Sequence, residues 1–118
     1  MELVVPLDRL EASSLALVGG KALNLGILTA AGFRVPPGFV VTTLAYEVAV
    51  GDRIDALLAD LPAAVDRVAA AERIRATILA APVPEEVRQG VLTAYRDLGP
   101  DVAVAVRSSA TAEDLAFA

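Results

Sequence analysis

The stretch LVGGKALNLG, Leu17–Gly26, places a lysine directly behind two glycines and in front of a run of good helix formers. Glycines let the backbone adopt positive φ and approach a ligand closely. A helix that begins at Gly19, Gly20 and Lys21 directs its free amides and the positive end of its dipole at whatever lies before it. This pattern fits a phosphate pocket, with Lys21 as the cation and Gly19 and Gly20 as candidate backbone contacts.

The lysine itself is unusual for this chain. Among the 10 lysines and arginines, Lys21 is the only lysine, which indicates a site that requires a compact ammonium rather than a guanidinium. The motif is not a Walker A loop, because that loop needs glycine where Leu15 stands and serine or threonine where Ala22 stands. Taken alone, so short a motif favours the simpler alternative of a helix start with a solvated lysine.

A second polar cluster follows the apolar run Val102–Val106, which predicts a strand buried on both faces. Arg107 then lies just past the carboxyl end of that strand, where ligands gather in α/β sheets. Its guanidinium can bind phosphate oxygens through two parallel hydrogen bonds. The alternative is a strand followed by a helix cap formed by Thr111 and Asp114, with Arg107 paired to Glu113 or Asp114. We interpret the two acids as partners of a helix dipole rather than as a metal site.

Composition narrows the chemistry. The chain has 118 residues, of which 56% are hydrophobic and 21% charged, so it is one domain at most, or a piece of one, with ample material for a core. A net charge of −5 argues against a nucleic-acid partner. The absence of histidine removes the base that would activate Ser108 or Ser109 as a nucleophile. Chemistry must therefore rest on carboxylates, Lys21 and arginines.

Nothing in the sequence indicates a membrane or an oxidising compartment. No uncharged apolar run is long enough to span a bilayer, and the N-terminus lacks the basic region of a signal peptide. The chain contains no cysteine, so it has no disulfide framework. We expect no membrane partner and a cytoplasmic location.

The periodicity predicts a mainly helical chain with a short strand. We expect an irregular lead-in or edge strand in residues 4–17, a helix over 21–32 that ends at Gly32, and a strand over 39–42. Thr42 or Thr43 should cap a helix that ends at Gly51. Pro84 should be the first residue of the last helix, which Gly99 and Pro100 end. Apolar stripes are expected at Ile54, Leu57, Leu58 and Leu61, at Val65, Val68, Ala71, Ile74 and Ile78, and at Val87, Val91, Ala94 and Leu98.

The two motifs together are more specific than either alone. The segment LVGGKALNLGILTAAGFRVPPGFVVTT, followed after a helical stretch by VAVRSSATAEDLAFA, resembles the N-terminal nucleotide-binding domain of the phosphoenolpyruvate synthase and pyruvate phosphate dikinase family. The same domain occurs in rifamycin phosphotransferases. The resemblance covers nearly the whole chain and is weakest across the alanine-rich helices.

This resemblance implies an α+β fold, the N-terminal part of an ATP-grasp-like nucleotide-binding domain with several helices packed on a small sheet. In such enzymes, the residues that match Lys21 and Arg107 contact the phosphates of ATP, and we assign Arg107 a catalytic role. The full enzyme splits ATP to AMP, phosphate and a phosphorylated histidine on another domain of the same parent chain. That domain passes the phosphoryl group to pyruvate, or to a rifamycin hydroxyl.

Related proteins continue past this region into a glycine-rich loop and a lobe with the acids that bind Mg²⁺. We therefore expect residues 1–118 to be an incomplete domain that is inactive alone. Separated from its second lobe, it should expose apolar surface and self-associate, with a homodimer as the simplest form. The alternative of another class is a stand-alone module that binds a nucleotide or a partner without turnover.

Overall fold

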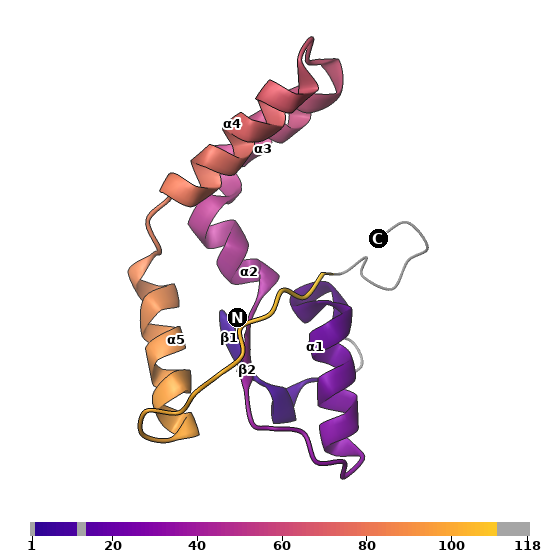
Figure 1. Ribbon diagram of the computed structural model, residues 1–118, viewed down its shortest axis with the longest axis vertical. Coiled ribbons are helices and arrows are strands. Elements are labelled where there is room, and N and C mark those ends of the chain that lie inside the picture. Colours follow the sequence, from indigo (N-terminus) through magenta and orange to yellow (C-terminus); the bar gives the residue numbers. More distant parts are fainter. Residues whose placement is uncertain (1, 12–13, 111–118) are drawn as a thin grey trace.

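The computed structural model describes residues 2–11 and 14–110. Figure 1 shows a body that contains α1, α5 and two short strands, from which the α3–α4 hairpin extends. The radius of gyration is 16.3 Å, whereas a compact chain of this length would have about 13 to 14 Å. The elements are β1 (Val4–Pro6), η1 (Leu7–Arg9), α1 (Leu15–Ala30), β2 (Phe39–Val41), α2 (Thr43–Tyr46), η3 (Glu47–Gly51), α3 (Asp52–Asp60), η4 (Leu61–Ala63), α4 (Arg67–Ala80) and α5 (Glu85–Leu98).

The two strands pair antiparallel, with Val5 opposite Val40, and confirm the predicted edge strand and the strand after the proline turn. Thr42 follows β2 and is the N-cap of α2, where its hydroxyl accepts a hydrogen bond from the amide of Ala45 at 3.4 Å. The same buried hydroxyl donates to the carbonyl of Glu2 at 3.0 Å. Thr42 therefore joins the sheet to the helix that follows it.

The helix α1 begins at Leu15, earlier than the predicted start at Lys21 and inside the stretch predicted to be irregular or extended. It contains a break at Gly19, where the backbone has φ 80° and ψ 168°. Its other end is confirmed at Gly32, which has φ 88°. The amide of Phe33 donates a hydrogen bond to the carbonyl of Leu28 at 3.0 Å, and the amide of Gly32 donates one to the carbonyl of Thr29 at 3.1 Å. These two bonds form a Schellman motif, in which glycine takes the left-handed position without strain.

The helix predicted to end at Gly51 continues instead through η3, a π-helical turn, into α3. Gly51 has helical φ and ψ of −49° and −55°, and the side chain of Glu47 occupies the space that a Cβ at Gly51 would fill. The glycine is thus a place of close packing rather than a helix end, which corrects the prediction.

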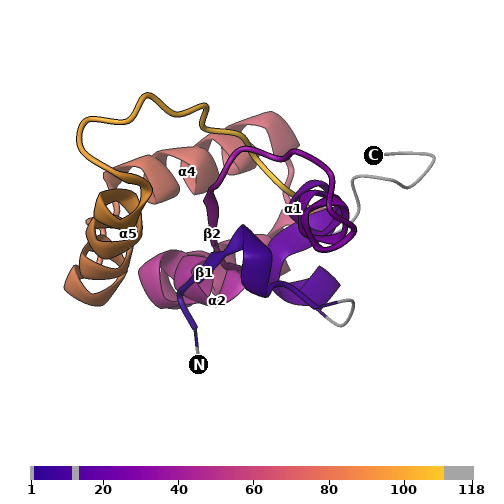
Figure 2. The ribbon, with the colours of Figure 1, turned by 90° about the horizontal axis from the view of Figure 1, so that it is seen from below.

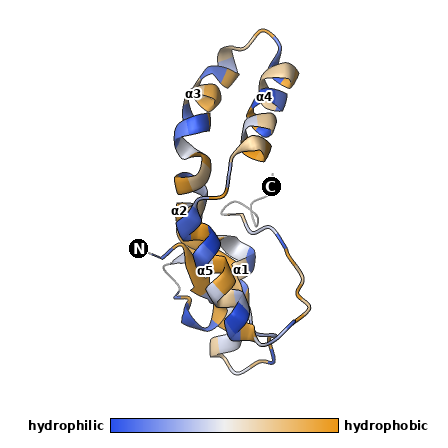
Figure 3. Cartoon of the chain, turned by 90° about the vertical axis from the view of Figure 1, so that its left-hand side faces the viewer, coloured by the Kyte–Doolittle hydropathy of each residue, from blue (hydrophilic) through white to orange (hydrophobic). Residues whose placement is uncertain are grey.

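The α3–α4 hairpin has its own small core of Val50, Ile54 and Ile74, with Leu57, Leu61 and Ile78 packed against it. The predicted stripes are wrong at Leu58, which is 46% exposed, at Val65 and Val68, which are 107% and 76% exposed, and at Ala71, which is also exposed. Val65 precedes α4, and Val68 lies in its first turn, next to the turn of the hairpin. Polar and apolar residues interleave along both helices in Figure 3.

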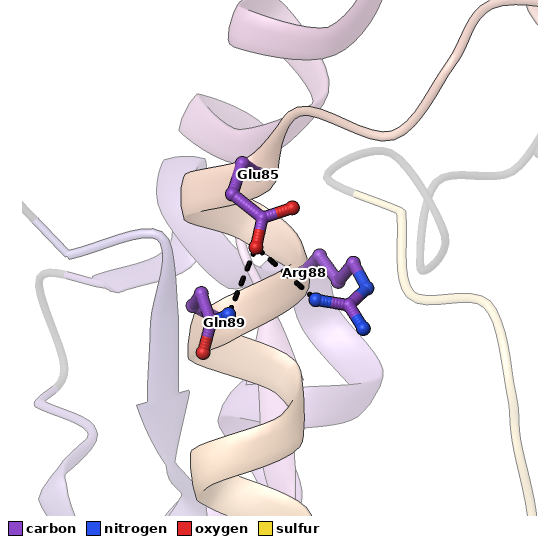
Figure 4. A network of polar contacts seen from close by, with 3 residues as sticks. All are labelled: Glu85, Arg88 and Gln89. Carbon is purple, nitrogen blue, oxygen red and sulfur yellow. Dashed lines mark hydrogen bonds and ion pairs between the residues drawn. The ribbon is translucent and has the colours of Figure 1, made fainter.

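The last helix, α5, begins one residue later than predicted, because Pro84 is its N-cap and not its first residue. Glu85 in the first turn accepts hydrogen bonds from Arg88 at 3.1 Å and from Gln89 at 2.8 Å (Figure 4). Val87 is buried on the inner face, and α5 contacts β1. Gly99, with φ 127°, ends the helix as predicted.

The predicted buried strand at 102–106 is absent. Val104 and Val106 are 52% and 92% exposed, and the only sheet within the described ranges contains β1 and β2. An apolar run becomes a strand only beside another strand that accepts its ladder hydrogen bonds, and none lies along this segment in the described part of the chain. We call residues 102–110 the arginine segment; Figures 1 and 2 show it running from the end of α5 to the start of α1.

Helices around a small sheet place the fold in the α+β class, as expected. The ATP-grasp-like assignment stays a prediction. The predicted cap at Thr111 and Asp114 lies outside the described residues. Among the helices that the structure describes, none has the length and apolar character needed to traverse a bilayer.

Candidate functional site

The two motifs singled out in the sequence are in direct contact. The amide of Gly20 donates a hydrogen bond to the carbonyl of Ala110 at 3.0 Å. The amide of Ala22 donates to Oγ of Ser109 at 3.1 Å, across 87 residues of sequence. Gly20 and Ala22 flank Lys21, so the arginine segment is attached on both sides of the lysine.

Gly19 makes this contact sterically feasible. A Cβ placed on Gly19 would lie 2.5 Å from Oγ of Ser109, 2.8 Å from its carbonyl carbon and 2.9 Å from the amide nitrogen of Ala110. Two of these atoms belong to the backbone and cannot rotate away. The φ of 80° with ψ of 168° also belongs to a region that only glycine occupies without strain. Gly19 is therefore required where the arginine segment meets α1.

Lys21 lies on α1, which is fixed in the body by contacts on either side of the lysine. Before it, Oγ1 of Thr43 donates to the carbonyl of Ala16 at 3.0 Å. After it, Gly26 lets η1 and the following residue pack closely, since a Cβ there would lie 2.9 Å from Cβ of Leu10. Gly26 is therefore a place of close packing between α1 and the chain that follows η1. Lys21 is half-buried and lies two residues after the break in α1.

Arg107 is exposed and lies in the arginine segment, two residues before Ser109. The segment is attached at its other end as well, because the hydroxyl of Tyr95 on α5 donates to the carbonyl of Val102 at 2.6 Å. The segment that carries Arg107 is therefore held by α5 on one side and by α1 on the other. The structure brings together the chain segments of the two predicted phosphate-binding cations.

The sequence did not indicate the parts that Tyr95 and Ser109 play. From the sequence, Ser109 is only one of the hydroxyls that follow Arg107, without a histidine to activate it, and the role of a distant helix cap has no local signature. Tyr95 does give a weak signal of its role, since the hydroxyl of a tyrosine that becomes partly buried requires a hydrogen-bond partner. The amide of Gly20, a candidate phosphate contact, already has an acceptor in Ala110.

A groove of about 820 Å³ lies elsewhere, between the strands and α5, and neither Lys21 nor Arg107 lines it. Its charged lining residues are Glu2, Asp8, Arg9 and Asp97. An excess of carboxylates repels a triphosphate, so this groove is the less suitable site for an anion. Residues 2–11 and 14–110 contain no group of three or more acidic, histidine or cysteine residues that could hold a metal ion.

Comparison with known proteins matches the chain to one family and to several named relatives. The family described as "Pyruvate phosphate dikinase, AMP/ATP-binding domain" matches residues 15–118. The chain is 41% identical, over 96% of its length, to phosphoenolpyruvate synthase of Aeropyrum pernix. It is 42% identical, over 98% of its length, to rifampicin phosphotransferase of Bacillus cereus. It spans only 15% and 14% of these two relatives.

Proposed function

The chain belongs to the pyruvate phosphate dikinase AMP/ATP-binding domain family, and from this premise we propose that it is the ATP-binding part of a larger, dikinase-type phosphotransferase. In this proposal the enzyme cleaves ATP and releases AMP and phosphate. One phosphoryl group passes to a histidine on another domain of the parent chain and from there to pyruvate, and water takes up the other. The chain contains no histidine of its own, so the acceptor belongs elsewhere.

Lys21 and Arg107 would hold the triphosphate. Phosphoryl transfer depends mainly on positioned positive charge that neutralises the phosphate oxygens, and needs little covalent help from the protein. The ammonium of Lys21 would act as a point charge, and the planar guanidinium of Arg107 as a two-point clamp. The observation that carries the proposal is the pair of hydrogen bonds from Gly20 and Ala22 to the arginine segment.

A magnesium ion would accompany ATP and shield the charge on its phosphates. The described residues offer no cluster that could hold it. We expect its protein ligands on the second lobe of the parent enzyme, and no step above depends on them. The part that residues 2–11 and 14–110 contribute is the binding and orientation of the phosphates.

The acceptor of the phosphoryl group has two candidates. Relatives named phosphoenolpyruvate synthase and rifampicin phosphotransferase match this chain at nearly equal identity. The ATP-binding region therefore does not distinguish pyruvate from a rifamycin hydroxyl. A non-catalytic module that binds the nucleotide without turnover is the alternative of another class.

The intact parent protein should be assayed for AMP release from ATP in the presence of either pyruvate or rifampicin. Lys21→Ala and Arg107→Ala should each lower turnover by roughly ten- to a thousand-fold, the usual effect of losing one electrostatic contact at a transferring group. Arg53→Ala, which removes an exposed arginine on α3, is the matched control. Unchanged turnover in both site variants would refute the site, and ATP binding without turnover on either acceptor would support the module.

A further inference from the structure

We propose that Ser109 is a positioning residue that fixes Arg107 beside Lys21 and so sets the affinity of the site for ATP. This inference rests on the proposed function, since it assigns a role within the same site. It concerns a serine that binds no substrate itself. Its hydroxyl acts through the backbone of α1.

The hydroxyl of Ser109 caps a helix to which it does not belong. Ala22 lies in the first turn after the break at Gly19, where helical amides have no acceptor within their own helix. A capping side chain normally comes from the residue just before the helix. Here Oγ of Ser109 accepts from the Ala22 amide at 3.1 Å, so the cap comes from 87 residues away.

This cap limits how far the backbones of the two cationic residues can move apart. Lys21 is the immediate neighbour of Ala22, and Arg107 is two residues from Ser109. Two residues of chain reach at most roughly 7 Å, so the attachment of Ser109 confines the backbone of Arg107 to the neighbourhood of α1. The bond from Gly20 to Ala110 acts in the same direction, at 3.0 Å.

The same contacts change the role of the two glycines. The Gly20 and Ala22 amides are both occupied by the arginine segment, and Gly19 has no room for a side chain against it. We therefore assign Gly19 and Gly20 to the docking of this segment. The side chains of Lys21 and Arg107 are left to bind the phosphates.

The test measures the Kd for ATP in the intact parent protein, by calorimetry, for wild type, Ser109→Ala and Ser108→Ala. Ser108 is the adjacent, exposed serine and serves as the control. Removal of one neutral hydrogen bond should weaken ATP binding by roughly three- to tenfold in Ser109→Ala, with less than a twofold change in the control. Ser109→Cys keeps a side chain of similar size that is a weaker hydrogen-bond acceptor, so its Kd for ATP should lie between those of Ser109→Ala and Ser108→Ala.

A second set of variants separates positioning from general destabilisation. In an Arg107→Ala background, Ser109→Ala should change the Kd by less than twofold, because the group that it positions is gone. The inference would be overturned if Ser109→Ala weakened ATP binding equally in the wild-type and Arg107→Ala backgrounds. It would also be overturned if the Kd of Ser109→Ala equalled that of the Ser108→Ala control. A wild-type protein that binds no ATP would instead overturn the proposed function.

Discussion

Replacing Gly19 by alanine tests the contact between the two motifs most severely. The new methyl group would meet Oγ of Ser109 at 2.5 Å and the backbone of Ser109 and Ala110 at 2.8 and 2.9 Å. The φ of 80° would also be strained for alanine. We expect the arginine segment to separate from α1 in this variant, because its backbone cannot yield while it stays attached.

Two contributions lower the free energy that holds the arginine segment against α1 in this variant. Backbone strain at such a position amounts to about 1–3 kcal/mol. Loss of the bonds from Gly20 to Ala110 and from Ala22 to Ser109 removes about 1 kcal/mol each. Together, about 3–5 kcal/mol corresponds to a loss of protection of these amides by roughly a hundred- to a few-thousand-fold.

Hydrogen exchange of the Gly20 and Ala22 amides in the intact parent protein measures this loss directly. Gly32→Ala is the matched control, since Gly32 also has positive φ, 88°, but no atom lies within 4 Å of the position of its Cβ. The control should leave exchange at Gly20 and Ala22 unchanged. Equally slow exchange in Gly19→Ala and wild type would refute the reasoning.

Three further substitutions probe the supporting contacts. Lys21→Arg should lower turnover, because a planar fork does not replace a point charge beside the break in α1; full activity in the AMP-release assay would show that charge alone suffices. Tyr95→Phe removes the 2.6 Å bond to Val102 and should weaken ATP binding by roughly three- to tenfold, and an unaltered Kd by calorimetry would count against it. Thr42→Val should lower the local stability of the α2 start by about 1–2 kcal/mol, read from faster exchange of the Ala45 amide; no acceleration would contradict the cap.

Features with local causes were predicted well from the sequence. The helix end at Gly32 and the cap by Thr42 or Thr43 each depend on the conformational preference or the hydroxyl of one residue. Both are confirmed, the first as a Schellman motif and the second at Thr42. The same holds for the end of α5 at Gly99. The sequence also predicts that Lys21 and Arg107 serve one phosphate site; the structure places their chain segments in contact, whereas the roles of the two side chains stay predictions.

Features that depend on distant partners were predicted poorly. The run at 102–106 has the pattern of a buried strand, but burial and ladder bonds require a neighbouring strand that the described residues lack. Val65 and Val68 continue a helical stripe, yet a pattern does not say whether another helix covers it. The sequence predicts a helix end at Gly51, because the pattern does not distinguish a glycine that ends a helix from one that lies inside it against a side chain such as that of Glu47.

The central claim is that Lys21 and Arg107 bind one triphosphate. A structure of the intact parent protein with a non-hydrolysable ATP analogue tests it most directly. We expect Nζ of Lys21 and the guanidinium of Arg107 both to lie within about 3.2 Å of phosphate oxygens of the same nucleotide. A nucleotide seated in the groove between the strands and α5, away from both cations, would contradict the account.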